Sequence, residues 1–204
     1  MFKIAVFISG RGSNLNSLIK YFKLKKSEVE IRLVVSNKKE AFGLEIAKDN
    51  DIETFVLGTK YENSANTFEK LTDIIKEKEI DLIVLAGFLK MIPNYFIKEF
   101  EYKIINIHPA LLPSFGGEGM YGMNVHKAVF SKSCQISGVT IHFVNENYDE
   151  GIIIAQEAIN ITNVKSPEEI AEKVLTVEHK LLPKIVELIS KSRIQIINNR
   201  VYIN

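Results

Sequence analysis

The sequence predicts an α/β protein whose central sheet is mostly parallel and flanked by helices. Short apolar runs alternate with segments of helical periodicity through the first half of the chain. The apolar runs are continuous rather than alternating, which is typical of strands covered on both faces. In the second half two strand-like runs follow one another, which predicts antiparallel additions to the sheet.

The first half contains five apolar runs that we expect to form strands. They cover residues 4–8, 31–35, 54–57, 81–86 and 102–107. Helices are expected directly after the first run, over 41–48 and over 67–78, because apolar residues recur there at helical spacing. Ser13 or Asn14 can cap the first of these helices.

The second half begins with a long glycine-containing loop over residues 109–123. A short helix over 125–130 and strands over 138–144 and 152–159 are expected to follow. A long helix over 166–191 begins near Pro167, and Pro183 predicts a kink within it. Asn198 and Asn199 separate two short apolar runs, which predicts a terminal hairpin. No linker or repeat interrupts the pattern, so we expect one domain over residues 1–204.

The composition restricts the function classes. The chain has 204 residues with 26 basic and 25 acidic side chains, for a net charge of +1. This balance disfavours nucleic acid and anionic membranes as partners. Cys134 is the only cysteine, which fits a reducing compartment. No secretory signal or apolar run of ~20 residues is visible, so we expect a cytoplasmic protein without a membrane span.

The loop Ser9–Asn14 joins the first strand to the first helix and is a candidate anion site. Gly12 allows close approach of the backbone, and the helix terminus favours negative charge. Ser13 and Asn14 can add side-chain donors. The alternative is an ordinary tight turn. The loop lacks the third glycine of a dinucleotide fingerprint, which disfavours a nicotinamide-dependent oxidoreductase. It also lacks the lysine of a P-loop, which disfavours a P-loop nucleotide site.

Asn106 and His108 lie at alternate positions at the carboxyl end of an apolar strand, where α/β proteins bind ligands. An imidazole exchanges protons near neutral pH, and a carboxamide donates to a developing oxyanion. The alternative is a histidine satisfied by a backbone carbonyl.

Asp149 follows the strand over 138–144 and is the third candidate. An aspartate against His108 would favour the imidazolium and raise the pKa of His108. The alternative is a solvated turn residue. His142 lies on the Thr140 side of its strand, where we expect it to border the site, whereas His126 and His179 are expected to be structural or surface groups.

These segments together resemble the phosphoribosylglycinamide formyltransferase family. The resemblance extends from residue 3 to about residue 182. The segment Asn106–Pro113 is similar to the motif of folate formyl and hydroxymethyl enzymes as a class, and Ser9–Asn14 narrows the choice to the glycinamide ribonucleotide branch. The remaining matching segments are 85–92 and 138–151.

The resemblance implies a single Rossmann-like formyltransferase domain and a specific reaction. The formyl donor would be 10-formyltetrahydrofolate, and the acceptor would be the amine of 5-phosphoribosylglycinamide in purine synthesis. His108 would be the general acid, Asn106 would help to hold the oxyanion, and Asp149 would keep the imidazole protonated. No metal is expected.

The resemblance also implies the binding residues. Gly12, Ser13 and Asn14 would hold the substrate phosphate, and Glu178 would contact the ribose-glycinamide part. Residues 1–107 would form the phosphate-binding half and 108–204 the folate-binding and C-terminal half. The folate would contact Leu89, Lys90, Met91, Ile92, Asn106, Asn145, Glu146, Asn147 and Tyr148. The alternatives are that Leu89, Met91 and Ile92 are core residues and that Glu178 is solvated.

The sequence departs from the family in two places. Ser64 stands where the family commonly has an arginine that touches the folate. The loop Phe115–Met123 is longer than in some members and is expected to act as a flap over the substrate. The oligomeric state is left open between a monomer and a homodimer.

Three other functions remain as alternatives. A methionyl-tRNA formyltransferase normally has a further C-terminal domain and a basic surface. A formyltetrahydrofolate hydrolase normally has an additional N-terminal domain, and here the first strand starts at residue 3. A non-catalytic ligand-binding domain of the same fold would have no need of Asn106, His108 and Asp149 together.

Overall fold

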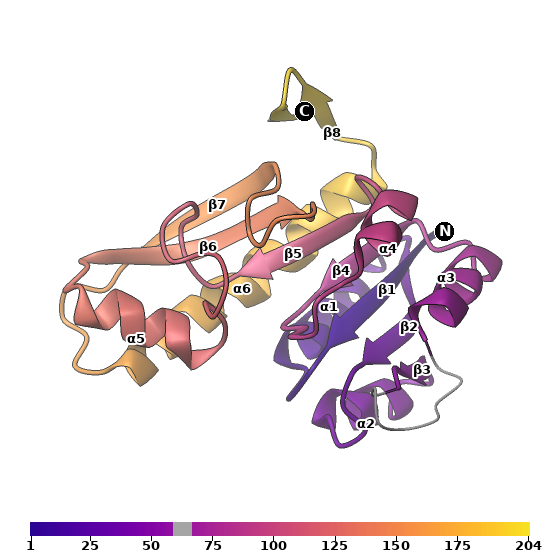
Figure 1. Ribbon diagram of the computed structural model, residues 1–204, viewed down its shortest axis with the longest axis horizontal. Coiled ribbons are helices and arrows are strands. Elements are labelled where there is room, and N and C mark those ends of the chain that lie inside the picture. The colour runs from indigo at the N-terminus through magenta and orange to yellow at the C-terminus, as the bar shows by residue number, and fades with distance from the viewer. Residues whose placement is uncertain (59–66) are drawn as a thin grey trace. The chain divides into compact units, whose positions relative to one another are not determined.

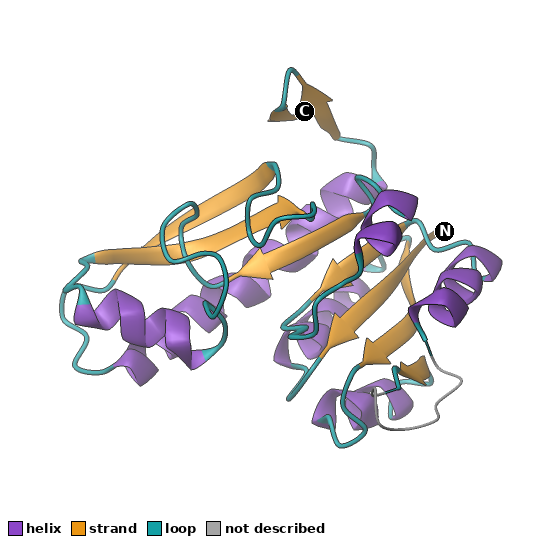
Figure 2. Cartoon of the chain, in the orientation of Figure 1, coloured by secondary structure: helices purple, strands orange, loops and turns teal. Residues whose placement is uncertain are grey.

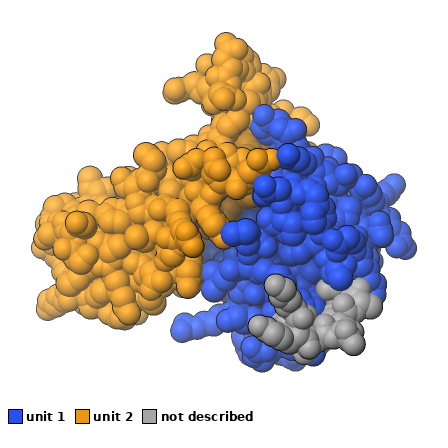
Figure 3. Space-filling view, viewed as in Figure 1, with its two compact units in different colours: residues 1–105 blue, residues 106–204 orange. Residues whose placement is uncertain are grey.

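The computed structural model describes residues 1–58 and 67–204. The chain divides into two compact units, Met1–Ile105 and Asn106–Asn204, which Figure 3 shows in different colours. Each unit is considered by itself.

The first unit is built on four parallel strands with helices beside them (Figure 1). The strands are β1 (Phe2–Ile8), β2 (Val29–Ser36), β3 (Glu53–Val56) and β4 (Leu82–Leu85). The helices are α1 (Ser13–Lys25), α2 (Phe42–Lys48), α3 (Phe68–Glu77) and α4 (Asn94–Glu99). The strands are hydrogen-bonded in the order β3-β2-β1-β4, the helices α1 and α2 contact each other, and α3 contacts α4.

The core of this unit follows from the continuous apolar runs. Val6 and Phe7 of β1 and Val84 of β4 have no exposed surface, as expected for strands covered on both faces. Thr67 caps α3 by accepting a hydrogen bond from the Lys70 N–H. The predicted strands and the helices α1, α2 and α3 are confirmed within a few residues.

Two local expectations in this unit were wrong. The N-cap of α1 is Gly12, with φ 72°, and no side chain caps the helix, so neither Ser13 nor Asn14 has the predicted capping role. The short helix α4, which follows Pro93, was not predicted. Its six residues are too few for helical periodicity to stand out.

The second unit contains antiparallel strands and a long helix (Figure 2). The strand β5 (Ile104–His108) begins in the first unit and ends in the second. The helix α6 (Pro167–Ser190) contacts α5 (Met123–Ser131), β6 (Ile136–Phe143) and β7 (Ile153–Asn160). Strands β8 (Ile194–Ile197) and β9 (Arg200–Ile203) form the predicted hairpin.

The elements of this unit also follow from local chemistry. Ser166 caps α6 by accepting a hydrogen bond from the Glu169 N–H, and Pro167 occupies the first turn. The helix continues through Pro183 to Ser190. The parallel strands of the first unit, the antiparallel β6–β7 pair and the flanking helices confirm the predicted fold class. Among the described residues, no helix is long and apolar enough to cross a membrane.

Candidate active site

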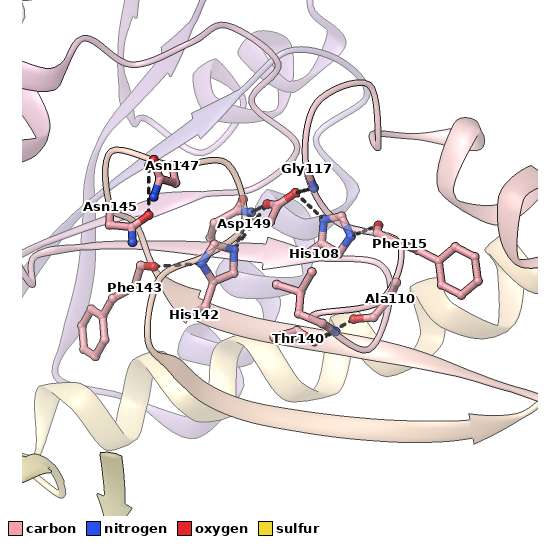
Figure 4. Close-up of polar contacts among 12 residues, drawn as sticks. His108, Ala110, Phe115, Gly117, Thr140, His142, Phe143, Asn145, Asn147 and Asp149 are labelled. Carbon is pink, nitrogen blue, oxygen red and sulfur yellow. Dashed lines mark hydrogen bonds and ion pairs between the residues drawn. The ribbon is translucent and has the colours of Figure 1, made fainter. Parts of the chain in front are cut away.

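The carboxylate of Asp149 lies between two imidazole rings (Figure 4). Its Oδ2 is 3.5 Å from His108 Nδ1, and its Oδ1 is 3.6 Å from His142 Nε2. Oδ2 also accepts a hydrogen bond of 3.0 Å from the Gly117 N–H. Asp149 has φ 55°, a left-handed conformation that aspartate adopts more readily than most residues. The turn after β6 therefore directs a carboxylate toward the end of β5.

His108 is buried at the carboxyl end of β5, with acceptors next to both ring nitrogens. Its Nε2 lies 2.8 Å from the carbonyl oxygen of Phe115, and its Nδ1 faces Asp149. Because a carbonyl accepts only, Nε2 carries a proton in this geometry. The alternative of a histidine satisfied by a backbone carbonyl is therefore met at Nε2, but a carboxylate faces the other ring nitrogen.

Burial and charge act in opposite directions on this pair. Burial lowers the pKa of His108, and this outweighs the raising effects of Asp149 and of the Phe115 carbonyl. Burial raises the pKa of Asp149, but the contact with His142, the charge of His108 and the Gly117 N–H together hold it below its ordinary value. Asp149 thus acts on His108 in the predicted direction, but the expected net rise in the pKa of His108 was wrong because desolvation is larger.

Asn106 completes the cluster from the same strand as His108. Its Nδ2 is 3.1 Å from His142 Nε2 and 3.5 Å from Asp149 Oδ1. The three predicted catalytic residues, Asn106, His108 and Asp149, are therefore together within the second unit. His142 borders them, as its position on β6 indicated.

Loop backbone from residues 115–117 closes one side of this cluster. Phe115 has φ 57° and Gly117 has φ 93°. A Cβ added at Gly116 would lie 3.2 Å from the Asp149 Cβ and closer still to the Leu112 side chain. Glycine at position 116 therefore lets the loop approach the carboxylate, and the Gly117 N–H then reaches it.

The candidate anion loop lies in the first unit and depends on close backbone contacts. The Gly43 N–H donates to the Gly10 carbonyl over 3.0 Å, and the Asn16 N–H donates to the Gly12 carbonyl over 2.9 Å. A Cβ added at Gly12 would lie 2.6 Å from the Gly43 Cα. Gly12 is therefore required both by its positive φ and by this approach. The predicted position of this loop relative to His108 stays a prediction.

The predicted folate-lining residues of the first unit differ in burial. Leu89 is 50% exposed and Met91 is 64% exposed, whereas Ile92 is only 7% exposed. Ile92 is therefore buried, as its alternative interpretation as a core residue requires, whereas Leu89 and Met91 are exposed. The Leu89 N–H donates to Ser9 Oγ over 2.7 Å, which ties this segment to the end of β1. Lys90 Nζ donates to the Gly58 carbonyl over 3.2 Å.

The predicted folate-lining residues of the second unit form the exposed turn between β6 and Asp149. The Asn147 N–H donates to Asn145 Oδ1 over 3.1 Å, and Asn147 Nδ2 donates to Glu150 Oε2 over 2.9 Å. Tyr148 is 48% exposed, and Glu146 is also exposed. The turn is thus ordered by its own side chains and leaves several of them open to a ligand.

A buried acid–base pair beside a carboxamide can transfer a proton and stabilise an oxyanion, as acyl transfer requires. Comparison with known proteins identifies the class. The family model for formyl transferases matches residues 2–186.

The chain belongs to the formyl transferase family. A chloroplastic phosphoribosylglycinamide formyltransferase of Arabidopsis thaliana is 42% identical over 195 residues, 95% of this chain. A phosphoribosylglycinamide formyltransferase of Haemophilus influenzae is 33% identical over 205 residues, and the match covers all of this chain and 94% of that protein. The chain spans 67% of the Arabidopsis protein's own length and 62% of a second plant relative's.

Comparison with solved structures leads to the same family. The crystal structure of phosphoribosylglycinamide formyltransferase from Anaplasma phagocytophilum matches with a TM-score of 0.90 and 37% identity. The match covers all of this chain and 93% of that chain. It bears out the mostly parallel α/β fold that the sequence predicts.

The remaining predicted residues of this formyl transferase lie as follows. Glu178 is buried on α6, so the alternative of a solvated side chain is wrong. His126 is buried on α5, and within the described part of the chain its Nδ1 has no hydrogen-bond partner. Ser64 lies outside the described residues. Sequence reasoning missed the contacts of Phe115 and Gly117, because backbone groups of a loop have no sequence signal for their tertiary partners.

Proposed function

We propose that this formyl transferase moves the formyl group of 10-formyltetrahydrofolate to the amine of 5-phosphoribosylglycinamide. The products are formylglycinamide ribonucleotide and tetrahydrofolate, in the synthesis of purines. The observation that carries the proposal is the Asp149 carboxylate held against His108 beside Asn106, in a chain of this family. The acceptor follows from the names of the relatives.

The chemistry requires one proton to move between two nitrogens. The amine nitrogen attacks the formyl carbon, and the formyl oxygen gains negative charge. An N–H of Asn106 stabilises this oxyanion. The bond from the carbon to N10 of the folate then breaks, N10 gains a proton, and the attacking nitrogen loses one. His108 is the group that carries this proton.

The protonation state of His108 sets the order of these steps. Because burial lowers its pKa, the ring is neutral in the free protein at neutral pH. A neutral ring accepts the proton of the attacking amine and then delivers it to N10 as the general acid. Asp149 stabilises the imidazolium that exists between these two transfers. Such an acid contributes on the order of 10²–10⁴-fold, and holding the two substrates together supplies much of the rest.

The binding roles extend the proposal. The N–H groups at the start of α1, which no side chain caps, hold the substrate phosphate with Gly12, Ser13 and Asn14. Glu178 binds the ribose-glycinamide part, and the folate binds along residues 89–92 and 145–148. The loop Phe115–Met123 acts as a flap. We further propose a cytoplasmic enzyme with small-molecule substrates, one domain over residues 1–204, and a monomeric or homodimeric state.

An assay with purified protein tests the proposal. Formyl-folate is supplied with and without 5-phosphoribosylglycinamide, and its absorbance is followed. Loss of formyl-folate only in the presence of the amine is the expected result. Loss without the amine would indicate a hydrolase, and no loss in either case would leave a ligand-binding domain.

A further inference from the structure

His142 contributes a second buried imidazole to the cluster around Asp149, with its side chain only 3% exposed. We propose that His142 is a positioning residue, which fixes the direction of the Asn106 carboxamide by accepting one of its N–H groups. This inference rests on the proposed function, because it concerns how Asn106 presents its other N–H to the formyl oxygen.

The first step is the tautomer of the His142 ring. Its Nδ1 lies 2.8 Å from the carbonyl oxygen of Phe143. Figure 4 marks this contact with a dashed line. A carbonyl oxygen accepts only, so Nδ1 must carry a proton. In the neutral ring the other nitrogen, Nε2, is then an acceptor. The main chain of β6 therefore decides which nitrogen of His142 faces the site.

The second step is the orientation of Asn106. His142 Nε2 lies 3.1 Å from Asn106 Nδ2, and the second acceptor beside this Nδ2 is Asp149 Oδ1 at 3.5 Å. If the amide were rotated by half a turn, its oxygen would face a ring nitrogen without a proton and a carboxylate oxygen. Both contacts would then be repulsive. The contact between His142 Nε2 and Asp149 Oδ1, at 3.6 Å, is longer than a hydrogen bond, so it does not require a proton on Nε2. The orientation with Nδ2 toward His142 and Asp149 is then the one that avoids both repulsive contacts.

The third step links this orientation to catalysis. Asn106 Nδ2 has two protons, and one of them is donated to His142 Nε2 in the shorter contact of 3.1 Å. The other proton has only the 3.5 Å contact with Asp149, the limit of a hydrogen bond, so it is the donor available to a developing oxyanion. Without His142 the carboxamide can rotate about its terminal torsion, and its oxygen can face the formyl oxygen instead.

A double-mutant cycle tests this role. We expect His142→Leu to lower kcat by about 10–10²-fold with a smaller change in KM, because a misdirected donor costs part of the oxyanion stabilisation. In an Asn106→Ala background the same change should have no further effect on kcat. His142→Gln, whose amide oxygen can accept near the position of Nε2, should restore a large part of the lost turnover.

A matched control is available on the same strand. Ser137 lies on β6, is 4% exposed, and its Oγ has no hydrogen-bond partner within the described residues. Ser137→Ala should leave kcat unchanged. A loss from His142→Leu that persists in the Asn106→Ala background would overturn the proposal. So would a loss that disappears only in an Asp149→Asn background, because His142 would then act through the carboxylate.

The tautomer gives a readout that does not depend on the reaction. Nitrogen-15 NMR of the histidine rings should show His142 protonated at Nδ1 and unprotonated at Nε2. A proton on Nε2 would overturn the proposal even in an active enzyme. If the protein transferred no formyl group but kept the Nδ1–H tautomer, the proposed function would fail while the contact between His142 and Asn106 would stand.

Discussion

Asp149 Oδ2 lies 3.5 Å from Nδ1 of His108, while the opposite nitrogen of the same ring lies 2.8 Å from the Phe115 carbonyl. The ring is thus held between two acceptors in a buried site. Only the imidazolium satisfies both of them, whereas burial favours the neutral ring. Because the two acceptors favour the imidazolium and burial favours the neutral ring, His108 can gain and lose a proton within one reaction. This is the role proposed for it.

The first prediction concerns Asp149→Asn. Asparagine tolerates the left-handed backbone at this position, so the turn should be kept. Loss of the carboxylate removes a raising effect on the pKa of His108, which should fall further. We expect kcat to drop by roughly 10²–10⁴-fold. An NMR titration of the His108 ring in both proteins checks the cause, and an unchanged or raised pKa would contradict it.

The second prediction concerns stability against pH. Burial, followed by the charge of His108, lowers the pKa of His126 below its ordinary value of 6.5, and burial also lowers the pKa of His108. Below about pH 7 the unfolded chain therefore binds more protons than the folded one. The stability that the two neutral histidines contribute should be fully present above pH 6.5, the ordinary histidine pKa. It should be lost as the pH falls toward the lowered pKa values of His126 and His108.

Urea unfolding at about pH 7.5 and about pH 5.5 measures this effect. The wild-type protein should be less stable at the lower pH. His126→Gln removes one of the two titrating groups and should reduce the difference. An equal pH dependence in the variant would show that His126 does not contribute.

Much of the fold could be predicted because its signals are local. The run around Leu82–Leu85 is apolar on both faces, so burial in a parallel sheet follows from the sequence itself. Ser166 and Pro167 indicate the start of α6, because serine is a common N-cap residue and proline is favoured in the first turn of a helix. By contrast, α4 spans six residues, too short for its periodicity to be seen. The cap of α1 was missed because Gly12 adopts its conformation to pack against Gly43.

The residues of the candidate site could be predicted from the sequence, but the net direction of the pKa shift of His108 could not. Asn106, His108 and Asp149 could be selected from strand ends and a turn. The sequence contains no measure of how deeply His108 is buried, so the net direction of its pKa shift was wrong. The contacts of Phe115 and Gly117 come from the main chain of a loop, and the partners of such groups depend only on tertiary structure.

The third prediction compares two glycines of one loop. Gly12→Ala places a methyl group against the Gly43 backbone at a positive φ, whereas a Cβ at Gly10 meets nothing within 4 Å. We expect Gly12→Ala to cost about 1–3 kcal/mol of stability and to weaken binding of 5-phosphoribosylglycinamide. Gly10→Ala is the matched control. Thermal unfolding and calorimetric binding measure both variants, and equal affinities would contradict the role of the Gly12 loop.

The fourth prediction concerns Ser9→Ala. The Ser9 hydroxyl accepts from the Leu89 N–H and donates to Asn37 Oδ1 over 2.5 Å, and its side chain is buried. Its removal leaves both partners unsatisfied, at a cost of about 1–3 kcal/mol. Because Leu89 begins the proposed folate-lining segment, the KM for 10-formyltetrahydrofolate should rise more than the KM for the amine. Steady-state kinetics with each substrate varied in turn checks this, and the reverse order would contradict the assignment.

The most direct test of the whole account follows an isotopically labelled formyl group from 10-formyltetrahydrofolate. In the wild-type protein the label should appear on the amine of 5-phosphoribosylglycinamide, detected by mass spectrometry of the nucleotide product. In His108→Ala the transfer should be lost while binding of 5-phosphoribosylglycinamide largely survives. Release of the label as free formate, or transfer at the wild-type rate by His108→Ala, would contradict the account.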